Sequence, residues 1–85
     1  MERLTTLRYW AGLKEAAGVS QEEIEGTTLA EVLAAARARH DARFAQVLER
    51  CSLLLDGEQV GTRDPSTIAL AGGGEVDCLP PFAGG

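Results

Sequence analysis

The groups that could do chemistry in this sequence lie at its carboxyl-terminal end, in the stretch LPPFAGG of residues 79–85. Most chain ends are polar and show no pattern, because they fray in water. This end instead places two prolines and a phenylalanine before Gly84 and Gly85. Glycine has no side chain and a permissive φ angle, so the two glycines give a cross-section narrow enough to enter an active site. The chemistry on offer is that of the Gly85 carboxylate.

A free α-carboxylate is anionic at neutral pH, with a typical pKa of about 3.3–3.7, and is therefore a poor acyl donor until it is activated. Pro80 and Pro81 lack N–H donors, so they end the preceding strand and stiffen the chain where it leaves the sheet. Fully extended, residues 80–85 reach at most roughly 20 Å. We expect a tail that enters a partner's pocket while the folded body stays outside.

The size and charge of the chain limit the classes of partner that it can have. The chain has 85 residues, enough for one domain, and its net charge of −5 argues against a nucleic-acid partner. No apolar run reaches the length of a membrane span and no signal segment begins the chain, so we expect a cytoplasmic protein without a membrane partner. Cys51 and Cys78 are too few for a zinc site; we expect no metal and two free thiols.

Residue types and spacing predict a small set of strands and helices. Strands are expected at 4–10, 19–25 and 75–79, with a hairpin at 51–61 around Asp56-Gly57; helices are expected at 11–17 and 29–40, with a further turn or two after Asp41. Thr28 and Glu31 fit a capping box in which hydroxyl and carboxylate bind each other's backbone N–H groups. Leu29, Val32 and the apolar residues that follow at helical spacing make the helix after it amphipathic.

Alternation along the strands predicts which side chains face solvent. Leu7 and Tyr9 share one face of the first strand, while Arg8 shares the other with Trp10, which leaves Trp10 exposed. Leu79 falls in the same way on the charged face of the last strand. The element order predicts an α+β roll of residues 1–79, in which one main helix covers one face of the sheet, followed by a flexible tail of residues 80–85.

The stretches LRYWAGLKEAAG and GGGEVDCLPPFAGG resemble the MoaD-type small subunit of molybdopterin synthase. That branch belongs to the ubiquitin-like sulfur-carrier proteins, the MoaD/ThiS group. The resemblance covers essentially the whole chain and implies a β-grasp fold with a mixed sheet. Two departures are visible: Cys78-Leu79 stands where such proteins often have a pair of aromatics, and Phe82 stands where a smaller apolar residue is usual.

The resemblance implies a role for each residue of the tail. An E1-like enzyme would adenylate Gly85 with ATP, and a persulfide protein would supply sulfur to make a C-terminal thiocarboxylate. Gly84 would be the spacer, and Pro80, Pro81, Phe82 and Ala83 would guide the tail into partner active sites. The large subunit of molybdopterin synthase would take the sulfur to build molybdopterin for the molybdenum cofactor. The carrier itself would have no catalytic residues and no stably bound cofactor.

In a β-grasp sheet the first and last strands are adjacent and parallel, which would place Trp10 and Leu79 together where the tail emerges. We expect them to form a docking patch, with Lys14 pairing with an acidic group of the partner. The simpler interpretations are a Trp10 partly covered by the first helix and a Lys14 that is merely solvated.

Other features predict only structure. Residues 72–74 are all glycine and are expected to form a turn rather than a phosphate loop. His40 is expected to interact with the helix dipole rather than to act in catalysis. Glu22 and Glu23 are expected on a solvated face. Cys78 is expected in the core, with redox pairing to Cys51 as the less favoured alternative.

Three other functions stay open. The chain could carry sulfur for thiamine, cysteine or a specialised metabolite, and both departures from the family pattern keep that alternative in view. It could be a ubiquitin-like modifier joined through Gly85 to lysines of other proteins. It could also be a binding module whose tail does nothing, in which case deleting Gly84 and Gly85 would leave its activity intact.

Overall fold

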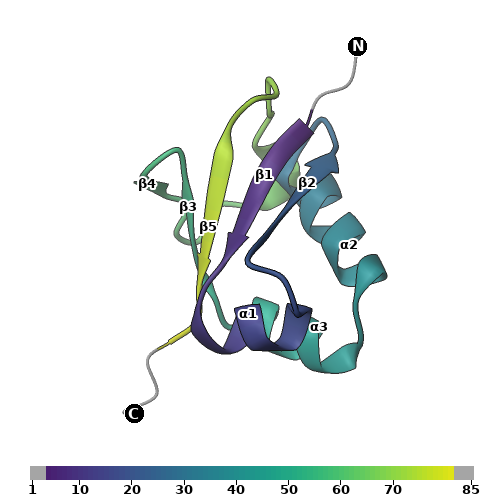
Figure 1. The fold of residues 1–85 in the computed structure, drawn as a ribbon. Helices are drawn as coiled ribbons and strands as arrows, with labels where there is room; N and C mark the ends of the chain where they lie inside the picture. The colour runs from purple at the N-terminus through teal and green to yellow at the C-terminus, as the bar shows by residue number, and fades with distance from the viewer. Residues whose placement is uncertain (1–3, 82–85) are drawn as a thin grey trace.

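The computed structural model describes residues 4–81, which form one five-stranded sheet and three α-helices (Figure 1). The strands are β1 (Leu4–Tyr9), β2 (Gln21–Glu25), β3 (Ser52–Leu55), β4 (Glu58–Gln59) and β5 (Glu75–Leu79). The helices are α1 (Ala11–Ala17), α2 (Leu29–Arg39) and α3 (Ala42–Glu49), with a short 3₁₀ helix, η1, at Pro65–Thr67. The predicted elements are confirmed, each close to its predicted ends.

The sheet is mixed, with strand order β2-β1-β5-β3-β4. Its central strands, β1 and β5, run parallel, and Arg8 lies opposite Asp77 in their register. The other neighbouring strands are antiparallel. Parallel pairing of the first and last strands makes both end at the same edge of the sheet (Figure 1). The predicted α+β roll with a β-grasp sheet is confirmed.

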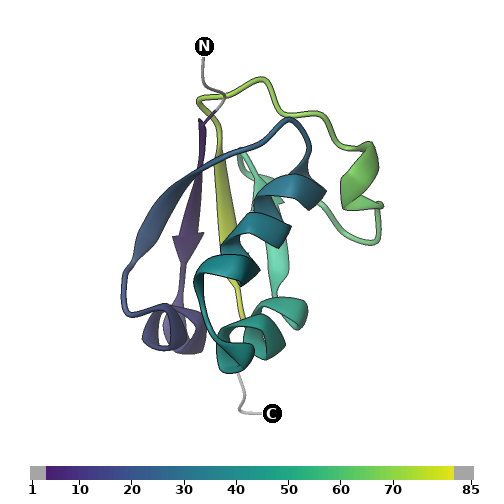
Figure 2. The same ribbon diagram turned by 90° about the vertical axis from the view of Figure 1, so that its right-hand side faces the viewer.

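α2 is the main helix over the sheet, as predicted, and the two shorter helices complete this layer. α2 lies across one face of the sheet, while the shorter α1 and α3 contact each other at the end where β1 and β5 finish (Figure 2). Leu13 of α1 and Phe44 of α3 are both fully buried. Short helices of 7 and 8 residues therefore complete the core at this end, where α2 does not reach.

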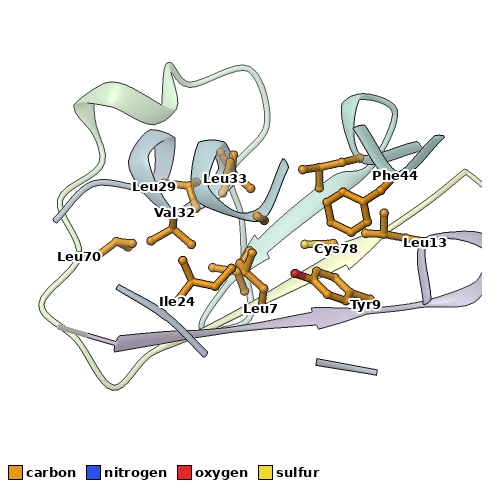
Figure 3. Packing of buried hydrophobic residues seen from close by; sticks show 14 residues of the cluster. Leu7, Tyr9, Leu13, Ile24, Leu29, Val32, Leu33, Phe44, Leu70 and Cys78 are labelled. Carbon is orange, nitrogen blue, oxygen red and sulfur yellow. The ribbon is translucent and has the colours of Figure 1, made fainter. Parts of the chain in front are cut away.

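The core fills the space between the sheet and these helices (Figure 3). It takes every second residue of the central strands, including Leu7, Tyr9, Val76 and Cys78, which are at most 2% exposed. The ring of Tyr9 meets that of Phe44 edge to face, with centroids 5.3 Å apart. Thr5 shares this face, and its buried hydroxyl oxygen has no hydrogen-bond partner among the described residues.

Local hydrogen bonds explain where the elements begin and turn. The Thr28 hydroxyl accepts from the Glu31 N–H and so caps α2, as predicted, but the Glu31 carboxylate accepts from the N–H of Thr27 rather than that of Thr28. The Asp41 carboxylate caps α3 by accepting from the Phe44 N–H. Asp56 and its following glycine both have positive φ angles, 49° and 88°, which is the backbone of a tight hairpin turn.

Within residues 4–81, no helix is both long enough and apolar enough to cross a membrane. In the same part of the chain, no three His, Cys, Asp or Glu side chains gather as a metal site would require.

Candidate docking site at the carboxyl-terminal end of the sheet

The chain leaves the sheet beside α3. Pro80 is buried and Pro81 is exposed. Both line a shallow hollow of about 680 Å³ together with side chains of α3 and its cap: Gln46, Val47, Glu49 and Arg50. The remaining residues of the predicted tail, 82–85, lie outside the described residues. The structure therefore describes only the first two residues of the predicted tail, and the folded body covers the first of them, Pro80.

Trp10 lies between the end of β1 and the start of α1, at the edge where β5 also ends. Its side chain is 43% exposed, as the strand alternation predicted. The indole Nε1–H donates to Asp77 Oδ1 at 2.9 Å, and the guanidinium carbon of Arg8 lies 5.6 Å from the centre of its ring. Two neighbours on the open face of the sheet therefore hold the indole in place while much of it stays in contact with solvent.

The backbone after Trp10 also fixes its position. Ala11 has a φ angle of +49°, in the left-handed region that a residue with a β-carbon rarely adopts. Such a conformation costs an alanine roughly 1 kcal/mol. It turns the chain sharply from β1 into α1, and Trp10 therefore stands at the corner.

The charges beside Trp10 form a small cluster on the open face. Arg8 Nε lies 3.3 Å from Asp77 Oδ1, and Arg8 Nη1 lies 3.2 Å from Glu75 Oε1. Ion pairs at this degree of exposure add little stability, since solvent screens them. Their consequence here is orientation, because Asp77 contacts both Arg8 and the indole.

Two leucines complete the open face near the exit. Leu79 is half-buried and lies opposite Ser52 in the β3–β5 register, on the predicted face. Leu54 lies opposite Asp77, so it shares this face, and it is half-buried without belonging to the core cluster. The sequence did not single out Leu54, because the run SLLL is continuously apolar and shows no alternation. Only the pairing of Leu54 with β5 shows which face of the sheet it occupies.

Lys14 is exposed on α1, and no carboxylate among the described residues lies within ion-pair distance of it. It lines two hollows that Trp10 also lines. The structure therefore brings the predicted docking residues Trp10 and Lys14 together, and it places Leu79 on the neighbouring strand end.

Glu22 corrects an expectation, because its side chain is only 18% exposed rather than solvated. It accepts from the Tyr9 hydroxyl at 2.7 Å, and His40 Nε2 lies 2.7 Å from the same carboxylate oxygen. Arg39 Nη1 lies 3.6 Å from the other oxygen. This cluster ties β1, β2 and the end of α2 together, and it gives His40 a specific partner.

Burial alone would disfavour the charged carboxylate of Glu22, but the bonds from His40 and Tyr9 outweigh it, and its pKa is lowered. Burial, followed by the bond to Glu22, raises the pKa of Tyr9. The two shifts agree, since a neutral phenol donates to an ionised carboxylate.

Both cysteines are free. Burial raises the pKa of Cys51 to about 11 and, together with the nearby Cys51 and Asp77, that of Cys78 to about 12. Thiolates are the nucleophilic form of cysteine, so both side chains are poor nucleophiles at neutral pH. Cys78 lies in the core, as predicted.

The fold is similar to solved structures over nearly the whole chain. One is small archaeal modifier protein 1 from Methanosarcina acetivorans, with a TM-score of 0.79, 20% identity and coverage of 100% of this chain and 99% of that chain. Another is the complex of subunits 1 and 2 of molybdopterin-converting factor from Helicobacter pylori 26695, with a TM-score of 0.68, 22% identity and coverage of 96% and 99%. Urm1 from Trypanosoma brucei matches with a TM-score of 0.73, 13% identity and coverage of 99% and 97%.

These likenesses establish the ubiquitin-like β-grasp fold. No curated protein matches the sequence. The ThiS family, in contrast, matches residues 7–85, a range that includes Trp10, β5 and both final glycines. The chain belongs to the ThiS family.

Proposed function

We propose that this chain is a sulfur carrier whose Gly85 carboxyl group is activated and thiolated, and that it serves as the small subunit of molybdopterin synthase. The observation that carries the proposal is the ThiS family match, which extends through Gly84 and Gly85. The parallel pairing of β1 and β5 supports it, because the chain then leaves the sheet beside an exposed tryptophan.

The chemistry takes place on the carbonyl carbon of Gly85. Its carboxylate attacks ATP in the active site of an E1-like enzyme, pyrophosphate leaves, and an acyl adenylate forms. A sulfur atom of a persulfide protein attacks that carbon, AMP leaves, and a thiol then cleaves the S–S bond to release the thiocarboxylate. Covalent intermediates of this kind divide one difficult step into easier ones.

The residues of this chain present the tail rather than catalyse. Since Pro80 is covered, the five residues from 81 to 85 can reach at most about 17 Å from the body. Cys51 and Cys78 have raised pKa values and are poor nucleophiles at neutral pH, which fits a carrier whose own thiols take no part in the transfer. ATP binds to the activating enzyme, and the carrier holds only covalent sulfur.

Docking uses the open face at the end where the tail leaves. Trp10, Leu79 and Leu54 supply apolar contacts there, and Lys14 meets an acidic group of the partner. In H. pylori, subunit 1 of molybdopterin-converting factor forms a complex with subunit 2, which supports a large-subunit partner for this chain as well. The choice of molybdopterin as the product rests on the ending EVDCLPPFAGG.

A second candidate is a protein modifier with the same activation step. Small archaeal modifier protein 1 and Urm1 are among the similar structures, and Phe82 departs from the molybdopterin-type pattern. In this candidate the activated Gly85 would be joined to lysines of other proteins.

Pyrophosphate exchange tests the activation step. The purified chain is mixed with the E1-like enzyme of the same organism, ATP and labelled pyrophosphate. We expect label in ATP with the intact chain and with the exposed control Glu58→Gln, and no exchange when Gly85 is deleted. Exchange that survives the deletion would overturn the assignment of Gly85. Adding the thiocarboxylated chain to the large subunit and the pterin precursor then tests the pathway, since only a molybdopterin carrier yields the dithiolene.

A further inference from the structure

Two exposed apolar side chains gather at one place. Trp10 and Val19 are 43% and 45% exposed, and within residues 4–81 they are the large hydrophobic side chains that lie open to solvent. Both line a single hollow of about 650 Å³ between α1 and the start of β2. The rest of its lining is Ala11, Lys14, Glu15, Gly18 and Ser20. Apolar surface that stays exposed and lies together in a hollow is typical of a binding site.

A second hollow of about 260 Å³ shares Trp10, Lys14 and Ser20 with the first. The residues that complete its lining are Arg8, Tyr9 and Gln21. None of these six residues carries a carboxylate, and its two charged members, Arg8 and Lys14, are both cationic. In a protein with a net charge of −5, a hollow lined in this way favours an anion.

The walls of both hollows are held in place before any partner arrives. The indole N–H of Trp10 donates to Asp77, and the guanidinium group of Arg8 lies over the indole ring. Gly18 has a φ angle of +79° and its N–H donates to the Lys14 carbonyl, which ends α1 and places Val19 on the rim. A preformed site loses less conformational entropy on binding than one that must be ordered.

We infer that the two hollows form one recognition site for a protein segment that carries an apolar side chain with a carboxylate one or two residues away. The apolar side chain enters between Trp10 and Val19. The carboxylate enters the smaller hollow and pairs with Lys14, since Arg8 already shares its charge with Glu75 and Asp77. Glu15 lines only the larger hollow, so it directs the acidic residue to the Arg8 side. The inference rests on the proposed function for the partner that carries this segment.

The test places the photocrosslinking residue benzoylphenylalanine at position 19 of the full chain, expressed in its own cells. The matched control carries the same residue at Glu58, which is exposed on β4 at the opposite edge of the sheet. After irradiation, the crosslinked partner peptide is sequenced. We expect an apolar residue with Asp or Glu one or two positions away. A peptide without a carboxylate there, or a yield no higher than that of the Glu58 control, would overturn the inference.

A charge reversal sharpens this result. Lys14→Glu in the position-19 background should reduce the crosslink yield about fivefold or more, because it sets like charges against each other. Arg37→Glu, an equal reversal at an exposed position on α2, should leave the yield within about twofold. Equal yields from the two reversals would contradict the role of Lys14.

The intact mass of the same samples separates this inference from the proposed function. A gain of ~16 Da, oxygen replaced by sulfur, reports the thiocarboxylate independently of any crosslink. The expected crosslink without that gain would support the site and remove the sulfur-carrier assignment. The gain without the crosslink would support the carrier and remove the site.

Discussion

The two faces of the sheet are built from the same strands and serve opposite purposes. On β1 and β5 the closed face carries Leu7, Tyr9, Val76 and Cys78, which are nearly inaccessible to solvent. The residues between and beyond them on the open face include an arginine, an aspartate, Leu79 and the exposed Trp10. Burial of apolar surface dominates stability, whereas exposed ion pairs contribute little. The closed face therefore holds the fold, and the open face is available for binding.

The largest effect on stability should come from the closed face. Leu7→Ala should lower the free energy of unfolding by about 3 kcal/mol, since it removes fully buried methyl groups and leaves a cavity. Thr6→Ala, one residue away and facing the other side, should lower it by at most about 1 kcal/mol. Urea unfolding measures both. Equal losses of unfolding free energy in the two variants would show that the closed face does not contribute more to stability than the open face.

The open face should show the reverse pattern, with a large effect on binding. Trp10→Ala should weaken binding to the adenylating enzyme by about 10- to 100-fold, because large aromatic side chains at interface centres carry much of the affinity. Its urea midpoint should fall only slightly. Calorimetric titration with Glu58→Ala as the control checks the affinity. A Trp10→Ala protein that binds normally, or that unfolds as readily as Leu7→Ala, would contradict the assignment of binding to the open face and stability to the closed face.

An effect of intermediate size should come from Glu22, which lies where the sheet edge meets α2. Since its pKa is lowered in the folded protein, its stabilising contribution is present above the ordinary glutamate pKa and is lost as the pH falls through the lower, folded value. Glu22→Gln should reduce stability at pH 7 by about 1–2 kcal/mol and flatten the acid side of the stability curve.

Glu23→Gln, the exposed neighbour on β2, serves as the control for this measurement. It should leave both the stability at neutral pH and its acid dependence almost unchanged. Thermal unfolding from pH 7 down to pH 3 measures the two variants, and parallel curves for them would contradict the role given to Glu22.

The smallest effect should be a gain of stability on the closed face. Thr5 is buried there, and its hydroxyl oxygen has no partner in the described part of the chain. Thr5→Val keeps the shape and removes the unsatisfied oxygen, so the free energy of unfolding should rise by about 1 kcal/mol. A domain of this size would then melt roughly 4–8 °C higher, which calorimetry resolves. A lower melting temperature would show that the hydroxyl group is satisfied.

Much of the difference between the closed and open faces of the sheet could be predicted from the sequence, because it depends on local patterns. Alternation along β1 and β5 identified the exposed Trp10 and the face of Leu79. Side chains that cap helices lie within a few residues of their partners, so the starts of α2 and α3 were also visible. The hairpin turn at Asp56 needs positive φ angles, and the glycine that follows it shows this directly.

The rest depends on contacts that no local pattern shows. Glu22 was expected on a solvated face because its neighbour Glu23 is also acidic, but its partners Tyr9 and His40 are 13 and 18 residues away. Leu54 stands in a continuous apolar run, and only its pairing with β5 decides its face. The hollows beside Lys14 form where α1 and the strand ends meet. Such features arise from the tertiary arrangement.

The intact mass of the chain purified from its own cells tests whether Gly85 carries sulfur. We expect a fraction of molecules about 16 Da heavier than the unmodified chain, with the added mass on Gly85 after peptide mapping. The protein that co-purifies with this fraction would identify the pathway. Only unmodified chain, together with high-mass conjugates that join Gly85 to lysines of other proteins, would contradict the sulfur-carrier account and favour the modifier.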